Sequence, residues 1–194
     1  MKLIVASNNQ HKISEIKKIL EKLDMDVVSL KDAGIDIEVE EDGKTFEENA
    51  YKKAKEVFDI VKDAYVLADD TGLMVDAING APGVYSARFS GEGATYEKNN
   101  AKLLDLLKDA ADKDRGAKFV CVIVLIMGDS RIVKVRGEIE GRILREPRGE
   151  NGFGYDPLFY VEELGKTFAE MSDEEKNSVS HRGRALEKLR EALK

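Results

Sequence analysis

Hydrophobic residues change their spacing within the first part of the chain. Residues 2–6, with the sequence KLIVA, form a short apolar run that is typical of a buried strand. From Ile13 onward, apolar residues return at helical spacing, at Ile16, Leu20 and Leu23. The pattern therefore predicts a strand, a short loop and a helix.

The next two segments have different periods. Residues 35–41, IDIEVEE, alternate strictly between apolar and acidic residues, so we expect a strand with its apolar residues on one face. Thr45 and Glu48 match a capping box, which marks the start of a helix. Apolar residues within 46–61 keep helical spacing, so this second helix is expected to be amphipathic.

The middle of the chain predicts another buried strand and another helix. Residues 64–68, AYVLA, form the strand, which we expect to end at the segment DDTGL, residues 69–73. Residues 79–93 are rich in glycine and are expected to form a loop. Leucines spaced through residues 96–109 then predict a helix.

A long β-hairpin is predicted after that helix. Residues 117–127, AKFVCVIVLIM, and residues 131–143, RIVKVRGEIEGRI, are joined by the turn GDS. Gly137 and Gly141 are expected to mark bulges or bends in the second arm. A second glycine-rich loop follows at residues 145–159.

The chain is expected to end in helices. Ser172 and Glu175 form another capping box, and apolar residues from Ala185 to Leu193 give an amphipathic last helix. The mixture of strand–helix units with a long hairpin predicts an α/β fold around a central mixed β-sheet, elongated, with two lobes and a substrate cleft between them. No segment has the sequence pattern of an interdomain linker, so we expect one domain over residues 1–194.

Composition narrows the possible functions. The formal net charge of -7 argues against binding to DNA or RNA, which depends on basic surfaces. No apolar run reaches the length of a membrane span or a signal peptide, so a cytoplasmic protein without a membrane partner is expected. The single cysteine, Cys121, lies in an apolar strand and reads as a core residue.

The first loop, SNNQHK at residues 7–12, is a candidate anion site. A helix N-terminus presents backbone N–H groups and a positive dipole, and Lys12 adds a cation, which together suit a phosphate chain. The alternative is that Ser7 or an asparagine only caps the helix. The loop does not match the GxxxxGK[ST] pattern, so a Walker-type NTPase is not supported.

Two adjacent carboxylates form the second candidate. Asp69 and Asp70 follow a buried strand, where one could support the loop and the other hold a metal or activate water. An Asx-turn is the structural alternative. One further carboxylate, from Glu40 or Glu41, would suffice for a Mg²⁺ ion that also binds phosphates and water.

Two later motifs are candidates for contacting a nucleotide base or phosphate. In GFGYDPLF, Phe153 or Tyr155 could stack on a base and Asp156 could accept hydrogen bonds, although aromatics beside a proline are often core residues. In KNSVSHR, Lys176, His181 and Arg182 precede or begin the last helix, and the donor fork of Arg182 suits a carbonyl or phosphate acceptor. A surface lysine and a capping histidine are the alternatives.

Taken together and in order, these motifs resemble the inosine/xanthosine triphosphate pyrophosphatase family. The segments that carry the resemblance are SNNQHK, FEENAYKKA, ADDTGLMVDAINGAPGVYSARF, GENGFGYDP and EEKNSVSHRGRAL, and they cover almost the whole chain. One departure is the first motif, which often begins with TGN in the family and here reads Ser7, Asn8, Asn9. Serine can supply the same hydroxyl, and asparagine tolerates left-handed backbone conformations.

The resemblance implies Mg²⁺-dependent hydrolysis of ITP, dITP and XTP to the monophosphate and pyrophosphate by a cytoplasmic homodimer. It implies that Glu40 and Asp70 bind the metal, with Glu41 as the alternative to Glu40, and that Asp70 accepts the proton. The substrate-binding residues that it implies are Ser7, Asn8, Asn9, Gln10, His11, Lys12, Lys53, Thr71, Phe153, Gly154, Tyr155, Asp156, Lys176, His181 and Arg182.

The resulting hypothesis is attack by water on the α-phosphorus. Cations would offset charge on the leaving pyrophosphate while Asp70 orients the water. A fixed donor, either Arg182 or a backbone N–H of the SHR segment, would favour a 6-oxo purine over adenine. A Maf-like pyrophosphatase for modified nucleotides and a nucleotide-sensing or RNA-binding module are the rival interpretations.

Overall fold

The computed structural model describes residues 2–21, 25–61, 63–128 and 130–194 and contains a seven-stranded mixed sheet. The strand order is β2-β1-β3-β4-β5-β6-β7, with β1 parallel to β2 and β3, and β6 antiparallel to β5 and β7. This confirms the expected α/β fold with a mixed sheet. The strands are β1 Lys2–Val5, β2 Asp26–Ser29, β3 Tyr65–Val75, β4 Gly116–Ile126, β5 Ile132–Ile143, β6 Phe159–Val161 and β7 Lys166–Thr167. The α-helices are α1 Gln10–Leu20, α2 Phe46–Val61, α3 Tyr96–Leu106, α4 Asp173–Val179 and α5 His181–Ala192.

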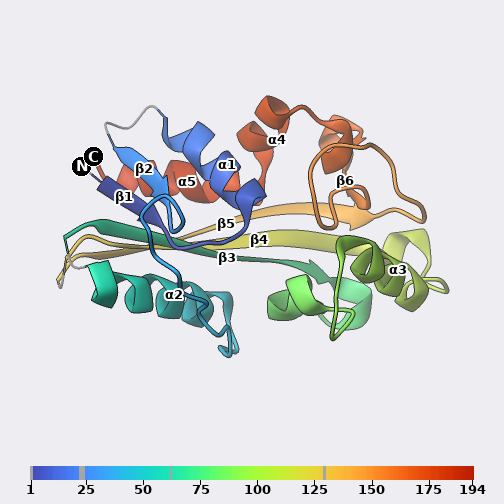
Figure 1. Ribbon diagram of the computed structural model, residues 1–194. Coiled ribbons are helices and arrows are strands. Elements are labelled where there is room, and N and C mark those ends of the chain that lie inside the picture. The colour runs from blue at the N-terminus through green and yellow to red at the C-terminus, as the bar shows by residue number, and fades with distance from the viewer. Residues whose placement is uncertain (1, 22–24, 62, 129) are drawn as a thin grey trace. The chain divides into compact units, whose positions relative to one another are not determined.

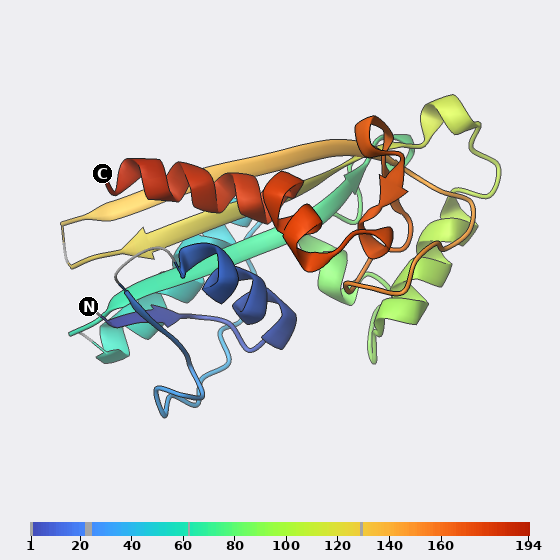
Figure 2. The ribbon, with the colours of Figure 1, turned by 90° about the horizontal axis from the view of Figure 1, so that it is seen from above.

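The chain divides into two compact units, each with its own core. The first unit comprises the described residues of Met1–Asp70, Cys121–Gly137 and Arg182–Lys194. Its helices α1 and α5 cover one face of the sheet and α2 covers the other (Figures 1 and 2). Alternating side chains along the strands give both faces of the sheet apolar residues. Leu3 and Leu67 pack with α1 and α5, and the neighbouring buried residues Ile4 and Val66 point to the opposite face.

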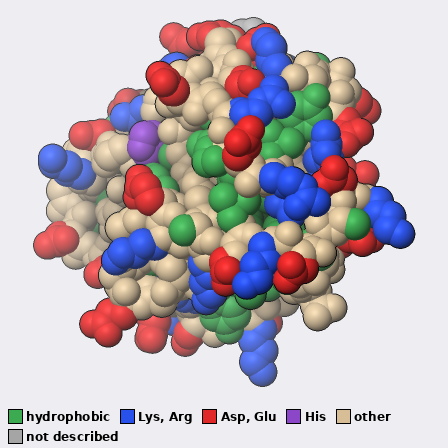
Figure 3. All heavy atoms as spheres, turned by 90° about the vertical axis from the view of Figure 1, so that its right-hand side faces the viewer, with side chains coloured by type: hydrophobic (Ala, Val, Ile, Leu, Met, Phe, Trp, Pro, Cys, Tyr) green, Lys and Arg blue, Asp and Glu red, His purple; other side chains and the backbone are tan. Residues whose placement is uncertain are grey.

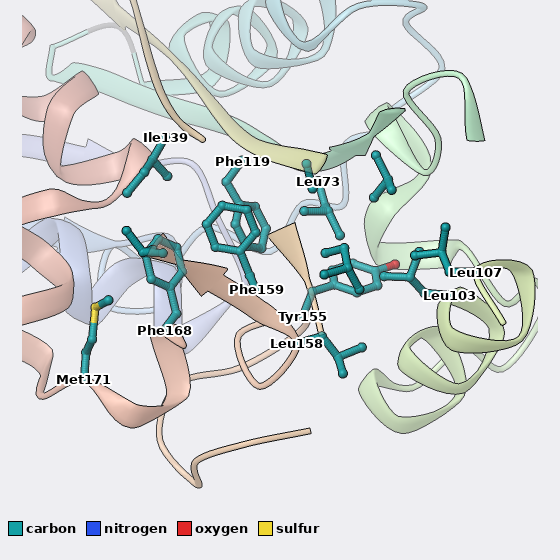
Figure 4. Close-up of a cluster of buried hydrophobic side chains, with 14 residues drawn as sticks. Leu73, Leu103, Leu107, Phe119, Ile139, Tyr155, Leu158, Phe159, Phe168 and Met171 are labelled. Carbon is teal, nitrogen blue, oxygen red and sulfur yellow. The ribbon is translucent and has the colours of Figure 1, made fainter. Parts of the chain in front are cut away.

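The second unit comprises Thr71–Val120 and Glu138–His181. Three phenylalanines form the centre of its core, where the ring of Phe119 lies 4.7 Å from that of Phe159 and 5.7 Å from that of Phe168. Leu73 of β3 lies beside them, and Tyr155, Leu103 and Leu107 continue the same cluster, as Figure 4 shows. Such edge-to-face and stacked rings contribute beyond their buried area and fix the β6 region against the sheet.

Most local predictions are confirmed. Asn9 caps α1, and capping boxes start α2 at Thr45 and α4 at Ser172. The hairpin of β4 and β5 closes through a hydrogen bond of 2.9 Å from the Met127 N–H to the Arg131 carbonyl. Two predicted positions, Leu23 of the first helix and Asp129 of the turn, lie outside the described residues.

Two strand predictions are wrong. Residues 35–41 form no strand, although their side chains still alternate between half-buried and exposed. Alternation needs only an extended backbone over a packed surface, whereas a strand also needs ladder partners. The second error concerns β3, which does not end at Asp69 but continues to Val75, because Leu73 and Val75 are again fully buried.

The glycine at position 141 of β5 is explained by close packing and not by the predicted bulge or bend. The strand is continuous from Ile132 to Ile143 and pairs with β6 at its end. A Cβ at Gly141 would lie 2.5 Å from the carbonyl oxygen of Tyr160, so the glycine is required by the close approach of β6. None of the helices in the described part of the chain is long and apolar enough to cross a membrane.

Candidate functional site

Asp69 and Asp70 lie in the middle of β3 and therefore point to opposite faces of the sheet. Both are buried, with 1% and 4% of their surface exposed. Asp69 shares its face with Leu67 and meets residues of α1 and α5, while Asp70 meets residues of α2. The two carboxylates that are adjacent in the sequence thus belong to different groups of side chains.

Asp69 anchors a network of ion pairs in the first unit. Its Oδ2 lies 3.2 Å from Lys12 Nζ and 3.2 Å from Arg182 Nη2. Arg182 also pairs with Glu15 of α1. Burial alone would lower the pKa of Arg182, but the carboxylates of Asp69 and Glu15 raise it, so the guanidinium stays charged. The network ties β3, α1 and α5 together and supports the fold on that face.

Asp70 belongs to a second group, which we call the Asp70 cluster: Glu41, Asn49, Lys53 and Asp70. Asn49 donates a hydrogen bond of 3.1 Å to Asp70 Oδ2. Lys53 Nζ donates to Glu41 Oε1 at 2.7 Å and to the Asp69 carbonyl at 2.6 Å, and it lies 3.8 Å from Asp70 Oδ1. Asn49 and Lys53 are four positions apart on α2, so one helix face supplies both.

The charges of the cluster perturb its pKa values. Burial raises the pKa of Asp70 above its ordinary value, and Lys53 and Lys12 offset part of this effect. Burial would lower the pKa of Lys53, but Asp70, Asp69 and Glu41 raise it, so the ammonium remains protonated. A buried carboxylate with an elevated pKa is suited to accept a proton.

The donor set of the Asp70 cluster fits a Mg²⁺ ion that is shared with a phosphate chain. Glu41 and Asp70 surround one ammonium, which leaves an excess negative charge and carboxylate oxygens, the ligands that Mg²⁺ prefers. Among the described residues, no group of three His, Cys, Asp or Glu side chains forms a complete metal site. The ion would therefore take its remaining ligands from phosphate and water, which is usual for Mg²⁺ with nucleotides.

The two candidate glutamates differ in position. Glu41 is half-buried and contacts Lys53, whereas Glu40 is exposed, because successive side chains of this extended segment point in opposite directions. Asn8 supports the segment through a hydrogen bond of 3.3 Å to the Ile37 carbonyl. From the sequence, Glu40 is the preferred metal ligand. The geometry instead favours Glu41.

The loop before α1 contains a helix cap as well as candidate phosphate donors. Asn9 Oδ1 accepts hydrogen bonds from the His11 N–H at 3.0 Å and the Lys12 N–H at 3.2 Å. The capping alternative is thus correct for Asn9, and it occupies two amides that the anion hypothesis had left open. Ser7 accepts from the Asn9 N–H, and Gln10 and His11 begin the helix with exposed side chains. Lys12 is held by Asp69 rather than extended into solvent.

In the second unit, residues 152–156 form a tight loop around the carboxylate of Asp156; we call it the base loop. Asp156 Oδ2 accepts from the Phe153 N–H at 2.9 Å and from Lys176 Nζ at 2.7 Å. The ammonium of Lys176 also lies 4.6 Å from the centre of the Phe153 ring. A Cβ at Gly152 would lie 2.1 Å from Asp156 Oδ2, so the loop requires glycine there.

Tyr155 does not present its ring as a stacking surface. It is 4% exposed and points into the core beside Leu103 and Leu107 (Figure 4). Its hydroxyl donates a hydrogen bond of 2.8 Å to the Ser86 carbonyl, and burial raises its pKa. The core alternative is correct for Tyr155, which anchors the loop, while Phe153 is half-buried and Gly154 beside it is open.

The remaining predicted residues have mixed placements. His181 is buried and stacks on Phe119, with 4.7 Å between ring centres. Lys176 is also buried, so the surface-charge alternative for Lys176 is wrong, and His181 is the first residue of α5. Thr71 follows Asp70 in β3 and is half-buried.

Sequence reasoning missed Glu15 and Asn49. Glu15 looked like an ordinary helix-surface residue, and only the fold reveals Arg182, far along the chain, as its partner. Asn49 carried a detectable signal, since an asparagine four residues before a lysine on the polar edge of an amphipathic helix places two donors together. Buried donors opposite a strand carboxylate are typical of a functional site.

An α/β fold with a mixed sheet, a buried carboxylate–lysine cluster and a separate aromatic loop defines a class of protein suited to bind polyanionic nucleotides. A profile of the Ham1 family matches residues 3–192, and the chain belongs to that family. This match confirms the family that the sequence motifs resemble.

The relatives that match are similar over their full length. A dITP/XTP pyrophosphatase of Clostridium perfringens is 54% identical over 198 residues, covering 100% of this chain and 97% of the relative. The corresponding protein of Geobacter sulfurreducens is 52% identical over 192 residues, covering 99% and 96%. A HAM1 protein structure from Coxiella burnetii has a TM-score of 0.90 at 42% identity, covering 100% of this chain and 98% of the other. A structure named nucleoside-triphosphatase / dITP/XTP pyrophosphatase, from Mycobacterium abscessus, has a TM-score of 0.78 at 46% identity, covering 97% and 98%.

Proposed function

We propose that this chain is a pyrophosphatase that hydrolyses dITP, ITP and XTP to the nucleoside monophosphate and pyrophosphate with the help of Mg²⁺. The observation that carries the proposal is the Asp70 cluster, in which a buried carboxylate with a raised pKa faces Asn49, Lys53 and Glu41. Full-length relatives named dITP/XTP pyrophosphatases support the substrate class. The reaction removes deaminated purine nucleotides from the nucleotide pool.

In this proposal the first unit binds the phosphates. Asp70 and Glu41 would hold Mg²⁺, which when bound offsets negative charge on the phosphate chain and polarises it. Lys53 contacts both of these carboxylates and Lys12 pairs with Asp69, and each lysine would exchange part of its carboxylate contact for a phosphate oxygen. Ser7 to His11 supply short polar side chains and backbone beside Lys12.

Asp70 would orient the attacking water and accept its proton. The hydrogen bond from Asn49 to Oδ2 and the nearby ammonium of Lys53 hold the carboxylate in place for this role. Because burial raises the Asp70 pKa, the carboxylate is a stronger base than an exposed aspartate. Attack on the α-phosphorus releases pyrophosphate without a covalent enzyme intermediate.

The second unit would bind the base. Phe153 offers a ring face for stacking, and Asp156 and Lys176 provide an acceptor and a donor beside it. Arg182 is engaged by Asp69 and Glu15, which supports the alternative that a backbone N–H of the SHR segment, rather than this guanidinium, reads the 6-oxo group. Adenine presents an amino donor there and would leave two donors facing each other, which costs roughly 1–3 kcal/mol.

We also propose a cytoplasmic homodimer that binds no nucleic acid polymer. On the face drawn in Figure 3, the described lysine and arginine side chains are interspersed with aspartates and glutamates, and the net charge of the chain is -7. A surface of that kind does not favour a polyanion. Light scattering of the purified chain gives the oligomeric state directly, and a monomer at working concentration would remove the dimer from the proposal.

The deciding experiment is pyrophosphate release from ITP, dITP, XTP, ATP, GTP and a modified pyrimidine triphosphate, with and without Mg²⁺. We expect release from the first three and little from ATP and GTP. Preference for the modified pyrimidine would support the Maf-like rival. Nucleotide binding without any release would support the sensing rival. Asp70→Asn should bind nucleotide yet lose about a hundredfold or more of turnover.

A further inference from the structure

Helix α3 contacts the base loop through two side chains on one of its faces. Asn100 Nδ2 donates a hydrogen bond of 2.9 Å to the Gly154 carbonyl. One helical turn earlier, the ring of Tyr96 lies 6.1 Å from that of Phe153, tilted by 45°. Residues four apart lie on the same side of a helix, so the amide and the ring act on adjacent residues of the loop.

The helix is itself a fixed support. Leu103 and Leu107 are fully buried in the core of the second unit. Asn99, next to Asn100, accepts from the Ser90 N–H at 2.8 Å and donates to the Ala87 carbonyl at 3.1 Å. The two neighbouring asparagines therefore hold different segments: Asn99 holds residues 87–90, and Asn100 holds the base loop.

The base loop needs such a support at Phe153. Glycines flank this residue on both sides, and both have positive φ, +76° at Gly152 and +64° at Gly154. Glycine permits many backbone conformations, so ordering it costs more conformational entropy than ordering other residues. Asp156 fixes the N–H of Phe153, and Asn100 fixes the carbonyl of the following residue, so the ring is constrained from both ends.

We infer that Asn100 and Tyr96 are positioning residues that hold Phe153 in the orientation that stacks on the purine base. The inference rests on the proposed function and deepens it, because it assigns a further determinant of base binding outside the motifs that carry the family resemblance. Loss of either contact leaves the Asp70 cluster intact, since that cluster lies in the first unit. The effect therefore falls on nucleoside binding and not on the chemical step.

The test uses the full chain and compares steady-state constants for ITP and XTP. Asn100→Ala removes the donor and is expected to raise KM about fivefold with kcat changed less than twofold, the factor expected for one ordinary hydrogen bond. The inhibition constant of pyrophosphate, which has no base, should stay unchanged. Ala101→Ser alters the adjacent exposed residue of the same helix and should behave like the unmodified chain.

A merely structural role for Asn100 would loosen the protein generally and move the pyrophosphate inhibition constant or kcat together with KM, which overturns the inference. Unchanged KM overturns it as well. If Asn100→Ala does not fold, Tyr96→Ala serves instead, because Tyr96 is 40% exposed, with Tyr96→Phe as the variant that keeps the ring and restores KM. Failure of the proposed function is distinguishable, since the unmodified chain would then release no pyrophosphate from ITP or XTP.

Discussion

Asn49 donates a hydrogen bond of 3.1 Å to Asp70, from the buried face of α2 to the middle of β3. This bond favours the ionised carboxylate and so opposes the effect of burial on the Asp70 pKa. It also restrains the orientation of the carboxylate, together with Lys53 at 3.8 Å from Oδ1. Asn49 is therefore a positioning residue for the proposed proton acceptor.

Replacing Asn49 should raise the Asp70 pKa further. In the metal-free chain, carbon-13 NMR of the Asp70 carboxyl is expected to show a pKa above the ordinary value, and Asn49→Ala should shift it upward again because a donor to the charged form is lost. Turnover should fall about tenfold or more through misplacement of the carboxylate. Ile60→Ala, at a 55% exposed position of the same helix, should leave the Asp70 pKa unaltered. An unchanged or lowered pKa in Asn49→Ala would contradict this account.

The adjacent aspartates of β3 should respond oppositely to neutralisation. Asp69→Asn leaves Arg182, 1% exposed, without one of its two carboxylates, and should destabilise the fold by roughly 3 kcal/mol, the cost of breaking a buried ion pair. Asp70→Asn should lose turnover but keep or gain stability, because the folded state then no longer bears the cost of ionising a buried carboxyl. Lys53 retains Glu41 and the Asp69 carbonyl as partners.

The raised pKa of Asp70 predicts how the free energy of unfolding changes with pH. A folded-state pKa above the unfolded value means that the folded chain binds the proton more tightly. The destabilisation by Asp70 is therefore absent below the ordinary aspartate pKa and grows as pH rises through the raised pKa. Urea unfolding of Asp70→Asn and the unmodified chain should differ most near neutral pH and converge toward pH 4. A larger difference in acid would refute the assignment.

Local sequence patterns are sufficient to predict features that depend only on neighbouring residues, such as helix caps. The caps at Asn9, Thr45 and Ser172 involve side chains within three positions of the amides they bind, so the sequence displays the whole interaction. The extent of β3 depends instead on strands paired from elsewhere, and an aspartate pair followed by glycine looks locally like a turn. The sequence predicts different parts for the two aspartates, and the continuous strand explains their separation, because it directs Asp69 and Asp70 to opposite sides of the sheet.

The sequence predicts candidate site residues but does not show which of them are held in the core. Tyr155 and Phe153 are both aromatic residues among glycines, and only the core around Leu103 shows that Tyr155 is an anchor. The motif predicts Arg182 at the substrate, and that stays a prediction; the structure adds its contacts with Glu15 and Asp69, which no local pattern displays. Long-range partners decide such roles, and a single sequence does not display them.

Arg115 should be among the most important residues for stability in the second unit. It is 2% exposed, and its guanidinium donates to the carbonyls of Leu107, Ile143 and Leu144 at 2.6, 2.7 and 2.9 Å. Arg115→Met would fill much of the volume but leave these carbonyls unsatisfied, costing roughly 3 kcal/mol. Arg115→Lys keeps a charge without the planar fork and should recover only part of the loss.

Chemical denaturation monitored by tyrosine fluorescence measures how the Arg115 substitutions change the free energy of unfolding. Arg145→Lys is the matched control, because Arg145 is an exposed arginine of the same region whose pairing with Asp112 is worth little at the surface. The Mg²⁺ dependence of the folded Arg115 variants should be normal, since Arg115 belongs to the second unit and makes no contact with the Asp70 cluster in the described structure. Equal stability of Arg115→Met and the unmodified chain would show that water replaces the guanidinium at no cost.

Glu41 and Glu40 offer a matched pair for locating the metal ligand. Both are glutamates on one extended segment, but Glu41 reaches Lys53 at 2.7 Å and Glu40 is exposed. Glu41→Gln keeps the size and removes the charge, so the Mg²⁺ concentration for half-maximal turnover should rise about tenfold or more. Glu40→Gln should leave it within about twofold, the range expected for a solvent-exposed charge. The opposite ranking would restore Glu40 as the ligand and would require the segment to turn over when substrate binds, because successive side chains of an extended chain cannot face the same carboxylate.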